Sequence, residues 1–399
     1  MSKSDKTNKS DRSVIYESGF TGHRSEYIAH LMRFINSQPE LHGKFVFVLN
    51  EQIRELIGEL STSPSYCIKF LKLNKEHKNS ITRSFWEWQL IAEVIKKQKS
   101  IYEIIFMEID PYLALLCTNR FKKFDLSVKG ILFQPYIHFK EVKERDFSIF
   151  KQFLKNYIFQ KLSILLNSNI KKLFVLNDKR TVDIMNKRIK HVFFNLPDPI
   201  VNDIKNVDSN ILKNVADKYA IKNFKKNLLL FGSIDYRKNL INIINSIKLL
   251  PIEVKKDVHL IVAGKFSTEV REKYLKHIDT NKDEISIAYN DSFVNGAERE
   301  PLFQSCDLVL MPYINFYSAS SVLGHAISHN KNVIVSKKGL IGRIVKEHNL
   351  GIAVDPLNAE EIKEAISKLL SDAKEFRYDC SMLIEEYSPH SFSKAILLN

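Results

Sequence analysis

Short apolar runs that alternate with helical patterns constrain the fold of this chain more than any other feature. In the second half the runs are Asn227–Phe231, His259–Ala263, Ile285–Tyr289, Leu308–Met311, Asn332–Val335 and Gly351–Val354. Between them, helical patterns lie at 240–250, 267–277, 297–305, 320–329, 340–347 and 358–371. Short buried strands that alternate with helices are typical of a parallel sheet covered on both faces. The second half is therefore predicted to be a doubly wound α/β domain.

The first half repeats this pattern. Its predicted strands are Ser13–Tyr16, Lys44–Leu49, Cys67–Leu71, Ile101–Met107, Gly130–Phe133, Lys172–Val175 and His191–Phe194, with helices notably at 25–36, 83–98 and 145–165. A chain of 399 residues is too long for one ordinary core and suits two domains. We predict two Rossmann-like domains, 13–200 and 226–399, which face each other across a cleft. Residues 201–225 form the linker region after a proline-broken stretch, and 1–12 form a disordered tail.

Several classes of protein are disfavoured by composition. No apolar run approaches the roughly 20 residues that span a bilayer, and the polar N-terminus does not resemble a secretory signal. The four cysteines are scattered, without the paired spacing of a disulfide framework or a zinc site. We therefore expect a reduced, cytoplasmic protein without a bound metal.

Positive charge is concentrated in the first half. Residues 1–200 contain 33 basic and 21 acidic side chains, a net charge of +12, out of +14 for the whole chain. Such an excess attracts an anionic partner such as lipid head groups or a phosphorylated acceptor, although solvated lysines explain it equally well. Nucleic acid is the least favoured partner, because no recognised binding module is present.

Two segments of the first half mix apolar residues with lysines, at 85–102 and 151–170. An amphipathic helix of this kind can rest on an anionic membrane surface, where the chain would be peripheral. It can also pack against a sheet, and packing is the interpretation we favour.

Two loops of the second half could hold an anion. The loop that follows the first strand begins at Gly232 and places Arg237 and Lys238 where a helix starts. Backbone N–H groups and the helix dipole favour an anion such as a diphosphate at that point. Another loop, after the fourth strand, leads through Ser320 and Ser321 into a helix that begins near Val322, which suits a second phosphate or a sugar hydroxyl. An ordinary serine-capped helix explains that second loop as well.

Together these loops resemble the GT-B glycosyltransferases, most closely family 4. The resemblance covers about Asn227 to Leu370 and is carried by GSIDYRKN (232–239), VAGKF (262–266), CDLVLMPY (306–313), SSVLGHAISHNKNVIVS (320–336), GLIGRIV (339–345) and NLGIAVDP (349–356). It implies that Lys238 contacts the donor phosphate, assisted by Arg237, next to the turn at Gly232. It also implies that the loop around Phe293 and Val294 packs the nucleotide base.

The sequence departs from the family at one pair of positions. Family 4 enzymes usually carry two glutamates eight positions apart, which bind sugar and ribose hydroxyls. The matching residues here are Tyr317 and His325, which can form hydrogen bonds but lack the carboxylate charge. The pair indicates a divergent subfamily, an unusual donor, or a chain that binds without turnover, and a plain core or surface histidine remains open for His325.

In the first half, Gly22, His23 and Arg24 follow the first strand. They resemble the family's first glycine-containing loop, in which Gly22 would allow close approach and His23 would contact the sugar or a phosphate, while Arg24 would face the acceptor. A simple strand–turn–helix is the equal alternative. Asp110 could also reach the acceptor, but we favour a helix N-cap before Pro111 for it. His138 is a further candidate for the acceptor side.

The resemblance thus implies a hexosyltransferase-like, retaining and metal-independent enzyme. It would move a sugar from a nucleoside diphosphate sugar to a glycan or lipid-linked acceptor in polysaccharide biosynthesis. The alternatives are a sugar-nucleotide epimerase or hydrolase of the same fold, and a nonenzymatic binder of sugar nucleotides or polyanions.

Overall fold

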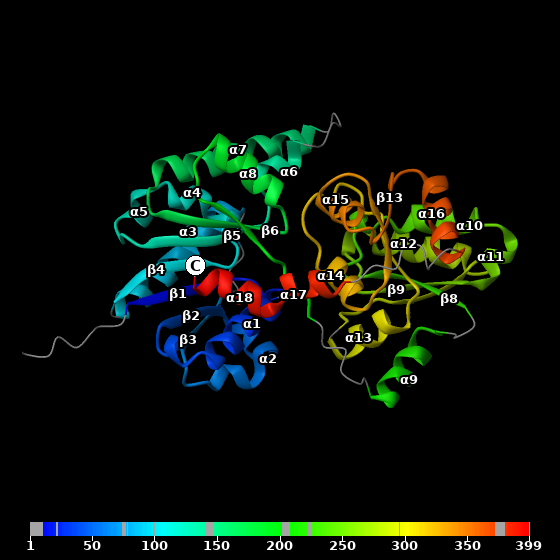
Figure 1. Cartoon of the computed structure of the whole chain (residues 1–399), viewed down its shortest axis with the longest axis horizontal. Coiled ribbons are helices and arrows are strands. Elements are labelled where there is room, and N and C mark those ends of the chain that lie inside the picture. The colour runs from blue at the N-terminus through cyan, green and yellow to red at the C-terminus, as the bar shows by residue number, and fades with distance from the viewer. Residues whose placement is uncertain are drawn as a thin grey trace, which may run out of the picture. The chain divides into compact units, whose positions relative to one another are not determined.

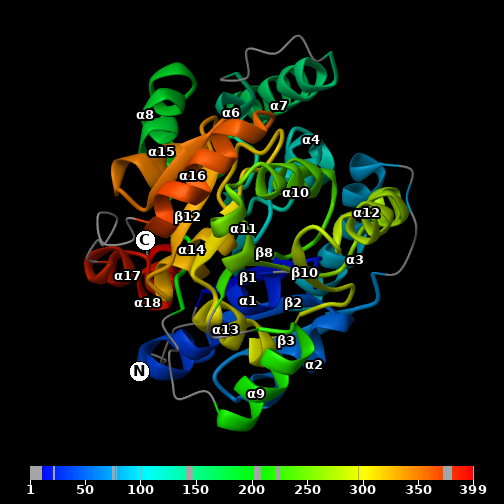
Figure 2. The ribbon, with the colours of Figure 1, turned by 90° about the vertical axis from the view of Figure 1, so that its right-hand side faces the viewer.

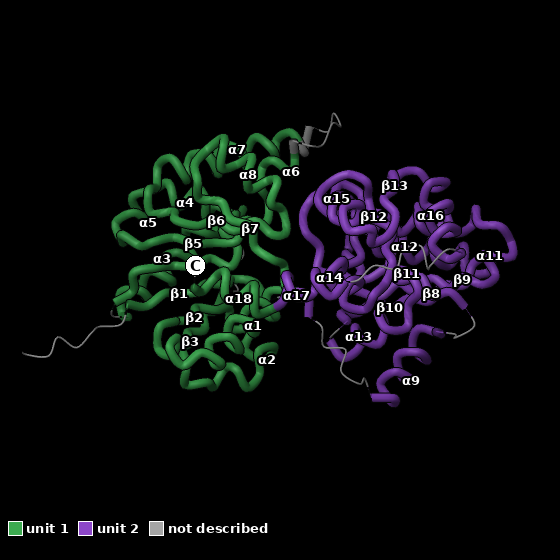
Figure 3. Tube along the Cα trace, viewed as in Figure 1, with its two compact units in different colours: residues 1–199, 389–399 green, residues 200–388 purple. Residues whose placement is uncertain are grey.

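The structure is a computed structural model. It describes residues 11–20, 23–73, 77, 79–98, 100–140, 147–201, 208–221, 225–294, 296–371 and 380–398. The chain divides into two compact units, coloured separately in Figure 3. Unit 1 comprises the residues up to Pro199 and those from Pro389 onward, and unit 2 comprises Ile200–Ser388.

Unit 1 contains a sheet of seven parallel strands in the order β3-β2-β1-β4-β5-β6-β7 (Figure 1). The strands are β1 (Arg12–Glu17), β2 (Phe45–Asn50), β3 (Cys67–Leu71), β4 (Ile101–Phe106), β5 (Ser127–Leu132), β6 (Ile170–Leu176) and β7 (Phe193–Leu196). Its helices are α1 (Arg24–Ser37), α2 (Arg54–Ile57), α3 (Ser80–Lys97), α4 (Leu113–Leu116), α5 (Asn119–Lys122), α6 (Tyr136–Lys140), α7 (Phe147–Leu166), α8 (Lys179–Arg188) and α18 (Pro389–Leu397).

Unit 2 contains six parallel strands in the order β10-β9-β8-β11-β12-β13. They are β8 (Lys226–Phe231), β9 (Val258–Ala263), β10 (Ser286–Asn290), β11 (Leu308–Met311), β12 (Asn332–Ser336) and β13 (Gly351–Val354). Its helices are α9 (Ser209–Lys218), α10 (Leu240–Lys248), α11 (Ile252–Asp257), α12 (Thr268–Asn281), α13 (Gly296–Ser305), α14 (Ser321–Ser328), α15 (Leu340–Glu347), α16 (Ala359–Ser371) and α17 (Ser381–Glu386). Figure 2 shows several of these helices from the side of unit 2.

Burial on both faces of the sheet explains the apolar runs. Along β8, Leu229 and Phe231 join one buried cluster of unit 2, whereas Leu228 and Leu230 join another. Successive side chains of a strand point to opposite faces, so a strand covered on both sides must be apolar throughout. The predicted doubly wound α/β class is confirmed for both units.

Strand order reverses beside β1 in unit 1 and beside β8 in unit 2. Each first strand lies between the second strand and the fourth, which is the order of dinucleotide-binding sheets. Ligands of such sheets bind at the carboxyl ends of the strands, at this point of reversal. The loops that follow β1 and β4 in unit 1, and β8 and β11 in unit 2, therefore border the expected ligand site of each sheet.

The C-terminal helix departs from the expected range of 226–399 for the second domain, because α18 belongs to unit 1. Phe392 is fully buried there, with its ring centroid 4.7 Å from that of Tyr27 on α1. His390 packs in the same way on Phe34, at 5.0 Å. The apolar face of α18 is covered by α1, so contacts rather than chain order assign this helix. The described residues of 201–225, a range expected as a linker region, belong to unit 2 and include α9.

Candidate functional site

Lys238 is buried directly after β8. It ends a 3-10 turn, η5 (Tyr236–Lys238), and its Nζ donates hydrogen bonds to the Phe231 carbonyl (2.6 Å) and to the Tyr313 hydroxyl (2.7 Å). The ammonium also lies 4.2 Å from the centroid of the Tyr313 ring. Burial, aided by the neighbouring charge of Arg237, lowers the pKa of Lys238 from 10.5 to about 7. Lys238, which is predicted to contact the donor phosphate, is therefore held at the carboxyl end of β8. Near neutral pH its side chain is only partly charged.

Arg237 lies at the exposed side of the same turn. Its Nε and Nη2 donate to Asp235 Oδ2 at 3.0 and 2.6 Å, and its guanidinium lies 5.6 Å from the Phe316 ring centroid. Because Asp235 also accepts the Arg237 backbone N–H at 2.9 Å, the turn and the side chain are fixed together. The sequence prediction singled out the arginine but missed the aspartate two residues before it.

Glycines bring two backbone segments close to the lysine. Gly232 has φ +103°, and a Cβ there would lie 3.4 Å from Lys238 Nζ and 3.9 Å from Val322 Cγ2. A Cβ at Gly264, after β9, would lie 1.8 Å from the Gly232 carbonyl oxygen. Gly232 was predicted as part of the site. Gly264 was recognised only as the end of a strand, yet no other residue fits there without displacing the loop.

The start of α14 borders this loop, as the nearness of Val322 to Gly232 shows. Ser320 occupies the N-cap position, Ser321 is the first residue of α14, and no side chain caps the helix. Burial raises the pKa of Tyr313, and an interaction with Ser320 opposes that shift. Tyr313 thus links Ser320 to Lys238 across the point where the strand order reverses.

Asn239 was not predicted and holds the neighbouring loops together. It adopts a left-handed conformation (φ +61°), which asparagine tolerates better than most residues. Its Nδ2 donates to the carbonyl oxygens of Pro312 (3.0 Å) and Pro356 (2.6 Å), which follow β11 and β13. The sign of this role in the sequence is that Asn239 directly follows the two cations Arg237 and Lys238.

The two positions that replace the family's glutamates are both buried. The Tyr317 hydroxyl donates to Asn315 Oδ1 at 3.2 Å, and Tyr317 Cα packs against Gly339, where a Cβ would approach it to 2.8 Å. On α14, the ring of His325 packs on Phe303, with centroids 5.4 Å apart. Their contact with a sugar stays a prediction.

The loop expected to hold the base has one exposed and one buried apolar residue. Phe293 is 68% exposed, whereas Val294 joins a buried cluster of unit 2. An aromatic ring so exposed has a face free to stack on a planar group. The base-binding role of both residues stays a prediction.

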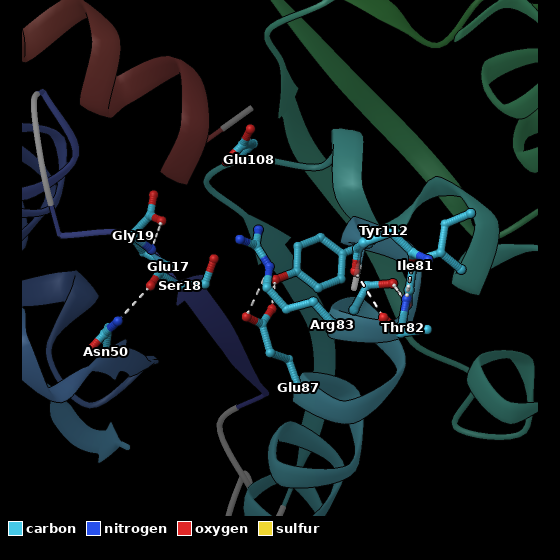
Figure 4. A network of polar contacts seen from close by, with 12 residues as sticks. Glu17, Ser18, Gly19, Asn50, Ile81, Thr82, Arg83, Glu87, Glu108 and Tyr112 are labelled. Atoms are coloured by element: carbon cyan, nitrogen blue, oxygen red, sulfur yellow. Dashed lines mark hydrogen bonds and ion pairs between the residues drawn. The ribbon is translucent and has the colours of Figure 1, made fainter. Parts of the chain in front are cut away.

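Arg24 in unit 1 joins the loops that follow β1 and β4. Its Nη1 lies 2.8 Å from Glu17 Oε1, its Nη2 pairs with Glu108, and Glu17 also accepts the Gly19 N–H at 2.6 Å. Figure 4 shows Glu17 and Gly19 at the end of β1. Burial raises the pKa of Glu17, and Arg24 opposes that shift. Two carboxylates therefore already balance the cation predicted to face the acceptor. Gly22 lies outside the described residues.

The ring of His23 is half-buried against Phe133 and Tyr27, with centroids 5.4 and 4.7 Å away. Its Nε2 is enclosed and has no hydrogen-bond partner among the described residues. Burial and the charge of Arg24 lower the pKa of His23 to about 4. The imidazole is therefore neutral at physiological pH, so its predicted contact would be a hydrogen bond rather than an ion pair.

The N-cap interpretation of Asp110 is wrong. Asp110 is itself the first residue of a 3-10 turn, η4 (Asp110–Tyr112), and Ile109 occupies the N-cap position. It accepts instead the backbone N–H groups of Phe133 (2.8 Å) and Gln134 (3.0 Å), which follow β5. Burial and the charge of Glu108 raise the pKa of Asp110 to about 7. Its function here is to connect two loops, which a local sequence pattern does not reveal.

His138 does not join the exposed loops of unit 1. It is buried on α6, and its Nε2 lies 2.8 Å from Asp178 Oδ2, which also accepts from the Thr181 hydroxyl. The acceptor contact of His138 stays a prediction.

A second network of buried polar side chains in unit 1 was not predicted from the sequence. The Tyr112 hydroxyl donates to Glu87 on α3, and Arg83 pairs with the same carboxylate at 3.4 Å (Figure 4). Tyr16, at the end of β1, lies 3.4 Å from the Tyr112 hydroxyl. Trp88 and Ile91 on α3 join the core, so the packing interpretation of the first amphipathic segment is confirmed.

The described residues contain no cluster of three or more His, Cys, Asp or Glu that could hold a metal ion. None of their helices combines the length and apolarity needed to cross a bilayer.

Comparison with known proteins supports the resemblance. Residues 213–386 match the family described as glycosyl transferases group 1. An uncharacterised glycosyltransferase from Methanocaldococcus jannaschii is 26% identical over 161 residues, which are 40% of this chain and 39% of that protein. The matched part thus spans less than half the length of this curated relative.

Solved structures match over nearly the whole chain. WaaG, a glycosyltransferase involved in lipopolysaccharide biosynthesis, aligns with a TM-score of 0.68 at 16% identity, covering 97% of this chain and 100% of WaaG. HepE from Anabaena, in complex with UDP and glucose, aligns with a TM-score of 0.65 at 10% identity, covering 97% and 95%. A UDP-forming trehalose-phosphate synthase from Burkholderia xenovorans gives 0.68 at 10% identity, covering 97% and 98%. The chain therefore has the GT-B fold, and its residues 213–386 are similar to the group 1 glycosyl transferases.

Proposed function

We propose that this protein transfers a sugar from a nucleoside diphosphate sugar, and that unit 2 binds the donor. The observation that carries the proposal is the position of Lys238 beside Gly232 and the start of α14. There the buried ammonium, glycine backbone and uncapped helix N-terminus converge at the carboxyl end of β8. A diphosphate is the anion whose size and charge suit such a combination.

Lys238 can donate a hydrogen bond to a phosphate and keep the two hydrogen bonds that it already makes. An ammonium has three N–H donors, and Lys238 directs two hydrogen bonds to Phe231 and Tyr313. The remaining donor is available to a phosphate oxygen. A bound diphosphate would in turn favour the charged form of the lysine, whose pKa is low because burial disfavours that form.

The same groups supply catalysis. Negative charge grows on the diphosphate as the glycosidic bond breaks, and Lys238, Arg237 and the N–H groups of α14 stabilise it. We propose that these groups suffice without a metal ion. Groups that are fixed before the reaction need little reorganisation, which makes this electrostatic contribution large.

The donor class agrees with the bound molecules of structures that share the fold. HepE was solved with UDP and with UDP-glucose. We propose a hexose donor, transfer with retention of configuration, and a glycan or lipid-linked acceptor in cell-surface polysaccharide synthesis at the cytoplasmic face of the membrane.

Binding without turnover is the second candidate. It is favoured by Tyr317 and His325, because neither supplies the carboxylate that the family's glutamates direct to the sugar. A hydrolase or epimerase of the same fold would differ in its product alone.

The test is a binding screen of UDP-, GDP- and other nucleotide sugars by calorimetry, followed by product analysis with candidate acceptors. Lys238→Ala should abolish measurable binding of the preferred donor, while Lys282→Ala, at an exposed position of unit 2, should leave it unchanged. Equal affinity in wild type and Lys238→Ala would refute the phosphate assignment. Tight binding without any sugar transfer would instead favour the second candidate, and release of free or altered sugar would favour the hydrolase or epimerase.

A further inference from the structure

Large apolar side chains stand exposed along one helix of unit 1, α7. Between 40 and 57% of the surface of each remains accessible in Phe150, Leu154, Ile158, Leu162, Leu165 and Leu166. They recur at intervals of mostly three or four residues, so they share one face of the helix. Figures 1 and 2 both show α7 at the periphery of unit 1, with no described element of that unit on its outer side. Such a continuous apolar stripe on a surface marks an interaction site.

The inner face of α7 combines apolar and polar side chains. Ile164 joins the core of unit 1, and Phe153, Tyr157 and Phe159 pack against that core. Gln160 and Ser163 are fully buried, and Asn167 follows them just after the helix end. Gln160 Oε1 accepts the Tyr136 N–H at 3.0 Å, and Asn167 Nδ2 donates to the Leu116 carbonyl at 2.9 Å. The buried polar groups are thus paired inside unit 1, while the leucines face outward. Packing against α4 and α6 explains the inner face of α7 and leaves the outer stripe unexplained.

The charge of α7 has a single sign. From Phe147 to Leu166 the sequence contains three lysines and no acidic residue. Lys155 is exposed beside Leu154, and Lys161 is half-buried beside Leu162 with its Nζ 3.3 Å from the Tyr157 hydroxyl. Long lysine stems can lie along an apolar surface while their ammonium groups reach lipid head groups. The whole of unit 1 adds to this attraction, because the positive charge of the chain is concentrated in its first half.

We propose that the outer face of α7 docks on an anionic phospholipid membrane, lying parallel to its surface. The helix inserts its leucines among the acyl chains and places its lysines at the phosphates. A second copy of this chain fits less well, because pairing α7 with itself would bring lysines together without an acidic partner. The proposal concerns a surface outside the donor site and does not depend on glycosyl transfer.

Flotation of the full chain with vesicles tests the apolar stripe. Vesicles of phosphatidylcholine with about one third phosphatidylglycerol should bind the wild type, and pure phosphatidylcholine should bind it weakly. The combined substitution Leu154→Ser, Ile158→Ser and Leu162→Ser should lower the vesicle partition coefficient on the order of 100-fold. All three side chains are exposed, so the thermal unfolding temperature should stay close to that of the wild type.

Charge is tested separately with Lys155→Gln and Lys161→Gln. Each should lower partitioning into the anionic vesicles about fivefold, and added salt should weaken wild-type binding. Leu249→Ser with Ile252→Ser provides the matched control, because both side chains are exposed and belong to unit 2 rather than to α7. The control variant should bind vesicles like the wild type.

Two results would overturn the proposal. One is unchanged vesicle binding by the folded Leu154/Ile158/Leu162 variant. The other is a wild type that does not bind anionic vesicles and sediments as a dimer, while the variant with the same three substitutions sediments as a monomer. That second outcome would assign the stripe to contact between copies of the chain.

Discussion

Raising the pH should weaken donor binding through Lys238 alone. The diphosphate of a nucleotide sugar has no proton to lose near neutral pH, whereas the pKa of the free lysine is about 7. If only the ammonium binds the diphosphate, affinity is proportional to the protonated fraction. Affinity should then fall about tenfold per pH unit above pH 7, or about 50-fold between pH 7 and pH 9, until the pKa in the complex is reached.

Calorimetry in buffers of different ionisation enthalpy measures the linked proton directly. At pH 8 about 0.9 proton should be taken up per donor bound, because about nine tenths of the free lysines are neutral there. Lys238→Arg keeps its charge over the whole range, so its affinity should not vary with pH. Lys238→Met should bind weakly at every pH.

The reasoning would be refuted by a wild-type affinity that stays constant from pH 7 to pH 9. It would also be refuted by the same pH dependence in Lys238→Met, since another group would then carry the proton. A slope that appears in the wild type and vanishes in both variants would assign it to the lysine. Tyr313→Phe offers a further check, because it removes one partner of Nζ without removing the charge.

Three further outcomes concern stability. Gly264→Ala should lower the free energy of unfolding in denaturant titration by more than about 2 kcal/mol, because its Cβ would lie 1.8 Å from a carbonyl oxygen. As a control, Gly43→Ala should cost only about 1 kcal/mol of backbone strain, because no atom lies within 4 Å of its Cβ. Burial raises the pKa of Asp110 from 3.8 to about 7, so its contribution to stability is fully present below pH 4 and declines as the pH rises through 7. Asp110→Asn should abolish that decline. An unaltered pH profile of stability in the variant would contradict the assignment. Arg24→Met should destabilise unit 1 by about 3 kcal/mol at neutral pH by leaving buried Glu17 unpaired, whereas a loss below about 1 kcal/mol would show that the pair behaves as a surface ion pair.

The strands could be predicted from the sequence because a parallel strand buried on both faces must be apolar throughout. Each of the thirteen strands among the described residues overlaps a predicted run, with ends that differ by at most three residues. The position of Lys238 followed in the same way, since a loop that directly follows a strand lies at the carboxyl edge of the sheet. Helix ends were matched less closely. The bounds of α15, Leu340–Glu347, are those predicted, whereas α12 ends at Asn281, four residues after the predicted end.

Contacts between distant residues could not be predicted. The sequence contains Lys238 and Tyr313, but their hydrogen bond and the low pKa of the lysine arise only when β8 and β11 lie side by side. Asp110 was misassigned for the same reason, because its partners Phe133 and Gln134 follow another strand. A local pattern contains no information about neighbours supplied by folding.

The sequence alone determined which segments are strands, where the loops that follow them fall, and which loop carries the cations. Tertiary structure decided the ionisation of Lys238, the return of α18 to unit 1, and the outward orientation of the leucines of α7. Secondary structure follows the local period of apolar residues, which the chain itself displays. Burial and ionisation depend on which surfaces meet, and only the packed sheets and helices fix that.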